Sequence, residues 1–308
     1  MNIVKLSWQT YGDFIPKGEL HGNMPGGISV YIRDVVPGTA FCRVRRQFFS
    51  LDIGMEQRLY RTVDDFARFF ALAWNNRLAI EQPPGLLNGY HDILDRVSHG
   101  LSERLQTMLE EVRRGLPLLF RPSYPMSLQH DDLLENNIHV DETTGRITGI
   151  VDWDNAIIAP FGVSFCGAEI VFGVQTLKDW HFHPCHLSLR RRFWEAFYKE
   201  VGDISEEDKR SIEVARLFGL FRTYGFEEND RATVHGVFSA CLGKGALDCS
   251  GRPGRYRRNE QEAASCIVNL SDASTTILAH KNRHSAIRAS FHYMRCGSES
   301  LTPIRNVA

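Results

Sequence analysis

Residues 126–154 read MSLQHDDLLENNIHVDETTGRITGIVDWD, and this stretch decides the fold of the chain. Two short runs rich in apolar and β-branched residues, 138–140 and 146–151, flank the polar segment 141–145, which ends in glycine. This pattern predicts a β-hairpin with a polar turn. The hairpin would return the end of its second strand to the polar segment that precedes its first strand.

Polar side chains of definite type lie at the two ends that the hairpin brings together. His130, Asp132 and Asn137 form the pattern His-x-Asp-x-x-x-x-Asn, and Asp152 follows the second strand. A carboxylate can orient an acceptor hydroxyl and take its proton, and Mg²⁺ prefers oxygen ligands such as amides and carboxylates. The residue types and their spacing are therefore suited to phosphoryl transfer.

These residues resemble the catalytic loop and metal-binding motif of the aminoglycoside phosphotransferase and choline kinase family. That family often shows His-Gly-Asp-x-x-x-x-Asn and then Ile/Val-Asp-Trp. The resemblance implies that Asp132 is the catalytic base, and that His130 braces the loop. It also implies that Asn137 and Asp152 bind Mg²⁺, with ATP as phosphoryl donor and a small-molecule hydroxyl as acceptor. Asp131 stands where the family usually has glycine, and its carboxylate either raises a neighbouring pKa or faces solvent.

An earlier strand fits the same family. Residues 28–32 (ISVYI) are β-branched and aromatic between two glycines and Pro37-Gly38, which predicts a strand that runs into a turn. Residues 30–38 resemble the family's hinge, whose backbone meets the adenine, so the resemblance implies nucleotide-binding positions at Ile32 and Asp34. No Ala-Pro-Glu triplet follows the Asp152 motif, which favours the small-molecule branch over protein kinases.

Helical periodicity fills most of the remaining chain up to residue 242. A capping-box-like start at Thr62 and Asp65 precedes an aromatic stripe at i, i+3, i+4, i+7 and i+8, which we interpret as core. A second helix is expected over 92–114, because apolar residues line one face until Gly115 and Pro117. Residues 187–242 again show helical spacing, typical of the family's substrate subdomain.

The two ends of the chain depart from the family pattern. Only 27 residues precede the hinge-like strand, whereas the family places a nucleotide-covering lobe with a phosphate-binding lysine there. Lys5 and Lys17 are the lysines of that segment, and we interpret both as surface residues. Residues 245–308 carry nine basic and five acidic residues with weak periodicity, which indicates a basic, weakly structured tail.

The fold prediction is therefore an α+β chain. It consists of a protein-kinase-like C-terminal lobe with a helical subdomain, and its N-terminal lobe is largely absent, as in a truncated relative. The predicted boundaries are 1–38 for the lobe remnant and hinge, 39–244 for the C-terminal lobe, and 245–308 for the tail. Loss of the covering lobe would weaken activity, so a catalytically inactive module that binds a ligand or a partner protein stays as the alternative.

Composition restricts the setting in which the chain works. The net charge is -1, so no overall field favours nucleic acid or a membrane surface. The sequence contains no apolar run of the ~18 residues needed to span a bilayer, and we identify no secretory signal. The seven cysteines are scattered and odd in number, which favours reduced thiols. We therefore expect a cytoplasmic protein.

Three further groups were weighed against this site. Residues 179–186 are rich in metal-ligand types but lack the spacing of a zinc site, so a loop is the preferred interpretation. A basic cluster at Arg43, Arg45 and Arg46 is close enough to the hinge to meet phosphates, although solvated faces are the default. Glu169, Glu227, Glu228 and Asp230 lie in the region where the family's carboxylates hold the amine of a cationic substrate, but exposed charges at helix ends are the preferred interpretation of each.

Overall fold

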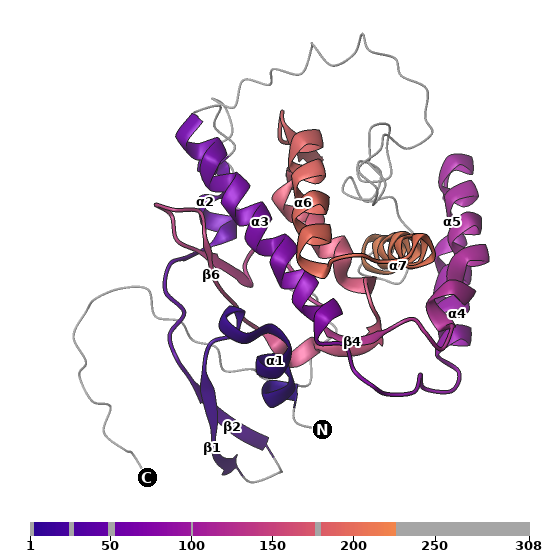
Figure 1. Cartoon of the computed structure of the whole chain (residues 1–308), viewed down its shortest axis with the longest axis horizontal. Coiled ribbons are helices and arrows are strands. Elements are labelled where there is room, and N and C mark those ends of the chain that lie inside the picture. Colours follow the sequence, from indigo (N-terminus) through magenta and orange to yellow (C-terminus); the bar gives the residue numbers. More distant parts are fainter. Residues whose placement is uncertain (1–2, 25–27, 49–52, 100, 176–179, 226–308) are drawn as a thin grey trace, which may run out of the picture. The chain divides into compact units, whose positions relative to one another are not determined.

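The computed structural model describes residues 3–24, 28–48, 53–99, 101–175 and 180–225, all of which belong to one unit, Met1–Asn259 (Figure 1). Its α-helices are α1 (Ile3–Tyr11), α2 (Phe41–Phe48), α3 (Ile53–Asn75), α4 (Leu86–Ser98), α5 (Glu103–Gly115), α6 (His186–Val201) and α7 (Glu206–Tyr224). The 3₁₀ helices are η1 (Gly12–Phe14), η2 (Leu116–Phe120), η3 (Trp153–Asn155) and η4 (Val163–Val171).

The strands are short and antiparallel. They are β1 (Gly18–Met24), β2 (Ile28–Arg33), β3 (Thr39–Ala40), β4 (Met126–Gln129), β5 (Ile138–Val140), β6 (Ile147–Ile150), β7 (Ile157–Pro160), β8 (Gly173–Gln175) and β9 (Trp180–Phe182). Within the described residues they form the sheets β1–β2, β3–β5–β6, β4–β7 and β8–β9. The chain is α+β, as the sequence predicts. None of the helices in the described ranges combines the length and the apolar character that a membrane span requires.

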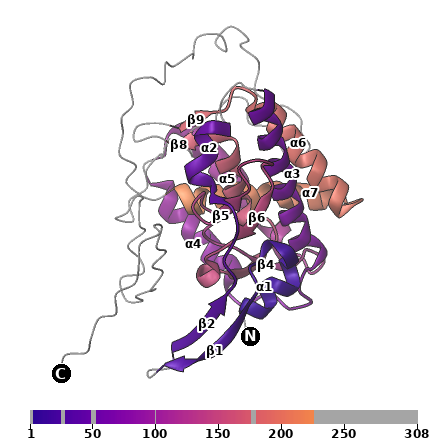
Figure 2. The ribbon, with the colours of Figure 1, turned by 90° about the vertical axis from the view of Figure 1, so that its left-hand side faces the viewer.

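Helix α3 lies at the centre of the apolar core. Its aromatic stripe is buried, and Phe66, Phe69 and Phe70 are each at most 2% exposed, so the interpretation of this stripe as core is confirmed. The ring of Phe70 stacks on that of Phe165 in η4 with centroids 4.4 Å apart. Helix α6 runs beside α3 in both views (Figures 1 and 2).

The predicted start of this helix is wrong. Helix α3 begins at Ile53, and Thr62 and Asp65 lie in its middle. Leu59 and Val63 are fully buried, so the apolar stripe extends one turn before the supposed cap. The two polar residues bind the hairpin of β5 and β6 instead: Asp65 accepts a hydrogen bond from the Ile147 N–H at 2.9 Å.

The predicted helix over 92–114 is two helices, α4 and α5. The chain leaves the helical conformation before α5, where Ser102 has φ −65° and ψ 154°. Buried residues of α4 and α5 continue the same spacing of three to four across the break, for example Val97, Leu101 and Leu105. The apolar pattern therefore hides the boundary, and the sequence could not reveal it by periodicity alone.

The segment before the hinge holds more structure than the sequence predicts. Of α1, η1, β1 and β2, only β2 corresponds to a predicted element. Helix α1 packs on the core, where the Tyr11 ring stacks on Phe69 at 4.3 Å and the Tyr11 hydroxyl donates to the Leu128 carbonyl oxygen at 2.5 Å. The β1–β2 hairpin extends away from the helices in both views (Figures 1 and 2).

The central hairpin prediction is confirmed. Strands β5 and β6 pair antiparallel with Ile138 opposite Ile150, and Gly145 closes the turn with φ 75°. A side chain at Gly145 would lie 2.2 Å from the Arg58 carbonyl oxygen, so the turn docks directly on α3. The predicted helical pattern beyond residue 225 and the predicted tail 245–308 lie outside the described residues.

Candidate active site

The loop between β4 and β5 is organised by one histidine ring. The His130 Nδ1 atom accepts the Asp132 backbone N–H at 3.1 Å. Because Nδ1 acts as an acceptor, Nε2 carries the proton and donates it to the Val151 carbonyl oxygen at 2.8 Å. Burial lowers the pKa of His130, which favours this neutral tautomer. The ring thus joins the start of the loop to the residue before Asp152.

Asn137 ties the far end of the loop to the same place. Its side-chain amide donates to the Asp132 carbonyl oxygen at 2.8 Å and lies 3.4 Å from the Asp132 carboxylate. Its backbone carbonyl accepts the Val151 N–H at 2.9 Å. These contacts bring Asp132, Asn137 and the end of β6 together, as the hairpin pattern suggests.

Asp152 has an unusual backbone conformation. With φ 66° and ψ 58° it is the non-glycine residue with positive φ among the described residues. A left-handed conformation at a residue other than glycine costs of order 1–3 kcal/mol and is concentrated at functional sites. The strain turns the chain sharply between β6 and Trp153, whose indole donates to the Ile150 carbonyl oxygen at 3.0 Å.

The electrostatics of the site favour a cation. Burial raises the pKa of Asp132, and the negative charge of Asp152 raises it further. The candidate metal ligands at this site are carboxylate and amide oxygens. Mg²⁺ prefers oxygen ligands, whereas Zn²⁺ is usually bound by cysteine and histidine. Mg²⁺ usually takes one or two carboxylates and completes its shell with water and phosphate oxygens. Asn137 and Asp152 fit that requirement.

The alternative metal segment is described from residue 180 onward. Among the described residues, no group of three or more His, Cys, Asp or Glu side chains is arranged to hold a metal ion. In 180–186, the Cys185 sulfur lies 2.9 Å from His183 Nδ1. Burial and the nearby Glu56 raise the pKa of Cys185 to about 11, so the side chain is a thiol at neutral pH.

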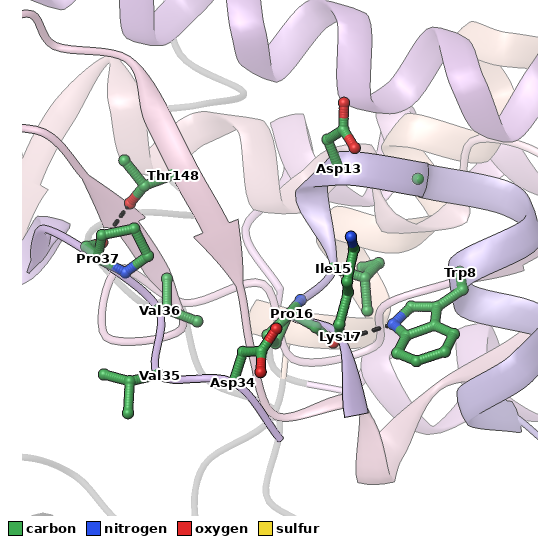
Figure 3. Close-up of a pocket in the computed structure, with 11 residues that line it drawn as sticks. Trp8, Asp13, Ile15, Pro16, Lys17, Asp34, Val35, Val36, Pro37 and Thr148 are labelled. Carbon is green, nitrogen blue, oxygen red and sulfur yellow. Dashed lines mark hydrogen bonds between the residues drawn. The ribbon is translucent and has the colours of Figure 1, made fainter. Parts of the chain in front are cut away.

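A cleft of about 520 Å³ opens beside the hinge. One wall comes from α1, η1 and the residues after them, including Trp8 and Lys17, and the other comes from residues 34–37 and Thr148 of β6 (Figure 3). Its volume lies in the range of small-molecule pockets. Asp34 lines the cleft, whereas the Ile32 side chain is 50% exposed on β2 and is not part of the lining.

Trp8 and Lys17 are functional candidates that the sequence did not reveal. Trp8 is fixed because its indole donates to the Pro16 carbonyl oxygen at 2.9 Å, and this bond is drawn in Figure 3. Lys17 is exposed, as the sequence predicts, and it also lies in the cleft lining. No local pattern could identify either residue, because their position depends on how α1 packs on the distant residues Leu128 and Phe69.

Two of the alternative charged candidates belong to ion pairs. Glu169 is 1% exposed and binds Arg190, whose Nη1 atom lies 2.7 Å from Glu169 Oε1, and Arg216 Nη1 lies 3.6 Å from the same oxygen. It is therefore committed to the core rather than to a substrate amine. Arg45 binds Glu135 of the catalytic loop, so this residue of the basic cluster is not available to a phosphate. Glu227, Glu228 and Asp230 lie outside the described residues.

The comparisons with known proteins point to one family. Residues 53–165 match the model of the phosphotransferase enzyme family. This range contains the loop between β4 and β5, the β5–β6 hairpin and Asp152. No curated protein matches the sequence.

Solved structures with a similar fold are distant. The GDP complex of aminoglycoside 2'-phosphotransferase-IIIa is 16% identical, with a TM-score of 0.43, over 68% of this chain and 67% of that chain. Aminoglycoside phosphotransferase APH(3'')-Id from Streptomyces rimosus, solved with ADP and streptomycin, is 14% identical, with a TM-score of 0.42, over 70% of this chain and 80% of that chain. The ethanolamine kinase of Plasmodium vivax is 14% identical, with a TM-score of 0.41, over 72% and 63%.

Proposed function

Because residues 53–165 belong to the phosphotransferase enzyme family, we propose that this chain transfers the γ-phosphoryl group of ATP to a hydroxyl of a small molecule with the help of Mg²⁺. The observation that carries the proposal is the convergence of Asp132, Asn137 and Asp152, which the hydrogen bonds of His130 and Val151 hold at one point. Phosphoryl transfer depends almost entirely on positioning and on electrostatic stabilisation, and this arrangement supplies both.

Asp132 is the proposed general base. Its carboxylate would orient the acceptor hydroxyl and take the proton as the oxygen attacks phosphorus. Burial and the charge of Asp152 raise the pKa of Asp132, and a carboxylate with a raised pKa is a stronger base. His130 is neutral and spends both ring nitrogens on backbone groups, so its role would be to fix the loop.

Asn137 and Asp152 are the proposed Mg²⁺ ligands. When bound, the ion would neutralise charge on the phosphates and hold them beside Asp132. The cleft beside the hinge is the proposed nucleoside site, with the backbone of residues 34–37 on one side and Trp8 on the other. Lys17 is the basic residue of that lining, and Asp13 and Asp34 are its acidic residues.

Calorimetric titration of Mg²⁺·ATP into the full 308-residue chain tests the proposal. We expect saturable binding that Asp152→Ala weakens by at least about tenfold, because a metal-bridged phosphate contact is lost. Asp132→Asn should bind nucleotide with little change and lose phosphoryl transfer by about a hundredfold or more. Asp154→Ala, two residues away and exposed, is the matched control and should behave as the wild type.

The same experiment separates the catalytic function from the inactive alternative. Binding without transfer to any acceptor hydroxyl, or to water, would identify a nucleotide-binding module. If the folded chain does not bind Mg²⁺·ATP at all, the proposal fails, and the chain would be a module for another ligand or a partner protein.

A further inference from the structure

The catalytic loop carries two adjacent carboxylates, and an arginine from a distant helix binds one of them. Arg222 of α7 donates through Nη1 and Nη2 to the two carboxylate oxygens of Asp131, and the Nη2–Oδ2 distance is 2.5 Å. A two-point contact between guanidinium and carboxylate fixes orientation as well as distance. The two side chains are only 29% and 21% exposed, so the pair is largely shielded from water.

The helix that presents Arg222 is seated firmly. Gly219 of α7 approaches the backbone of η4 so closely that a Cβ atom there would lie 2.0 Å from the Val163 carbonyl oxygen. One residue before it, the ring of Phe218 stacks on Tyr90 of α4 with centroids 4.0 Å apart. The last turn of α7 is therefore a fixed point from which Arg222 can hold the loop.

The two carboxylates face different partners. Asp132 lies beside Asn137 and is influenced by the charge of Asp152, whereas Asp131 is bound by Arg222. Without its partner, Asp131 would be a partly buried carboxylate with no compensating charge, which is strongly unfavourable. The loop could relieve that cost by rotating Asp131 toward solvent or toward the proposed cation, and either movement displaces Asp132.

We propose that Asp131 and Arg222 form a clamp that positions the catalytic loop, so that Asp132 and not Asp131 faces Asn137 and Asp152. The inference rests on the proposed phosphotransfer function for its catalytic consequence, but the clamp itself is a property of the loop. Neither residue is assigned a contact with reacting atoms, so both are positioning residues.

The test compares Arg222→Met, Arg222→Lys and the double variant Asp131→Gly/Arg222→Met. The first readout is amide hydrogen exchange of the peptide spanning residues 130–137, measured by mass spectrometry. Arg222→Met should speed exchange in this peptide by about tenfold or more, while peptides of α5 and α6 keep wild-type rates. Arg222→Lys keeps the charge but loses the planar two-point contact. Its exchange rates should therefore lie between those of the wild type and those of Arg222→Met.

The second readout is kinetic. Arg222→Met should lower kcat by about ten- to a hundredfold and leave the KM for ATP within about twofold, because misplacement of the base affects the chemical step. The double variant should recover part of the lost kcat, since removal of both partners leaves no uncompensated charge.

Arg192→Met is the matched control. Arg192 makes the same two-point contact with Asp64, at 2.7 and 2.6 Å, and this pair joins α6 to α3. Its loss should leave both exchange in the loop and kcat unchanged.

Amide hydrogen exchange tests the clamp even if the wild type transfers no phosphate. Failure of the proposed function and failure of the clamp are therefore distinguishable. Exchange that rises equally in all peptides, or a loop that Arg222→Met leaves at wild-type rates, would overturn the clamp. If Arg222→Met does not fold, Arg222→Lys and the double variant carry the same comparison.

Discussion

Thr62 shows how a single hydroxyl can hold the catalytic hairpin in place. It is fully buried in α3, and its Oγ1 atom donates to the Gly145 carbonyl oxygen at 2.6 Å. We expect Thr62→Val, which keeps the shape and removes the donor, to lower the free energy of unfolding by about 1–3 kcal/mol, because a buried carbonyl loses its partner. Urea denaturation followed by circular dichroism measures this loss.

Thr107 of α5 provides the matched control. Its hydroxyl donates to the Glu103 carbonyl oxygen at 3.1 Å on an exposed part of the helix. Thr107→Val should change the free energy of unfolding by less than about 0.5 kcal/mol, because water replaces the lost donor. Equal losses in the two variants would show that helix propensity, rather than the contact with Gly145, accounts for the effect.

Residues that a short loop and a hairpin bring together were accessible from the sequence, and residues that tertiary packing brings together were not. His130, Asp132, Asn137 and Asp152 were named because their separations are set by one hairpin. Arg222 joins Asp131 across 91 positions, and no local spacing encodes that contact. The roles of the four named residues stay predictions that the proposed titration tests.

At the scale of elements, α7 depends on a glycine in its interior. Alanine at an exposed helical position normally stabilises by about 0.5–1 kcal/mol relative to glycine. At Gly219 the added Cβ would meet the Val163 carbonyl oxygen at 2.0 Å, so we expect Gly219→Ala to destabilise the protein by about 1–3 kcal/mol instead. Thermal unfolding checks the sign.

The same substitution in α4 should have the opposite sign. Gly89 has no atom within 4 Å of the position that a Cβ would take. Gly89→Ala should therefore raise the unfolding temperature while Gly219→Ala lowers it. If both variants were stabilised, α7 would not be packed as tightly on η4 as described, and the clamp would lose its fixed point.

The elements themselves were predicted unevenly, for physical reasons. The hairpin of β5 and β6 was predicted well because alternating apolar strands and a glycine turn are local signals. The boundary between α4 and α5 was missed because buried residues keep a helical spacing through the break. Helix α1 was missed because it is only nine residues long, too short to show a clear helical period, and it is held by tertiary contacts such as that of Asn76 with the Thr10 carbonyl oxygen at 2.7 Å.

At the scale of the whole molecule, buried histidines make the fold sensitive to acid. Burial lowers the pKa of His130, His139 and His183, and burial together with Arg190 lowers the pKa of His186 to about 4. The unfolded chain takes up protons near pH 6.5, and the folded chain does so only at lower pH. The stability that the neutral rings contribute is therefore complete above about pH 6.5 and is lost as the pH falls toward the folded values.

Asp65 and Asp132 act in the opposite direction at lower pH. Burial raises the pKa of both, so the folded state keeps its protons at a pH where the unfolded state has released them. Their contribution to stability is thus complete below the unfolded value of about 4 and is lost as the pH rises through the raised folded values. The window between pH 7.5 and 5.5 spans the unfolded histidine value of about 6.5, so a variant that removes one histidine isolates its contribution there.

We expect the free energy of unfolding of the wild type, measured in urea, to fall between pH 7.5 and 5.5. The free energy of unfolding of His186→Phe should fall less over that range. Phenylalanine keeps the ring stack on Phe182, whose centroid lies 4.4 Å from that of His186, but it cannot take up a proton. A lowering of the pKa of His186 from 6.5 to about 4 corresponds to about 3 kcal/mol over the full titration, and part of it lies in this window. Parallel curves for the wild type and the variant would mean that His186 titrates alike in both states, and that its lowered pKa does not contribute to acid unfolding.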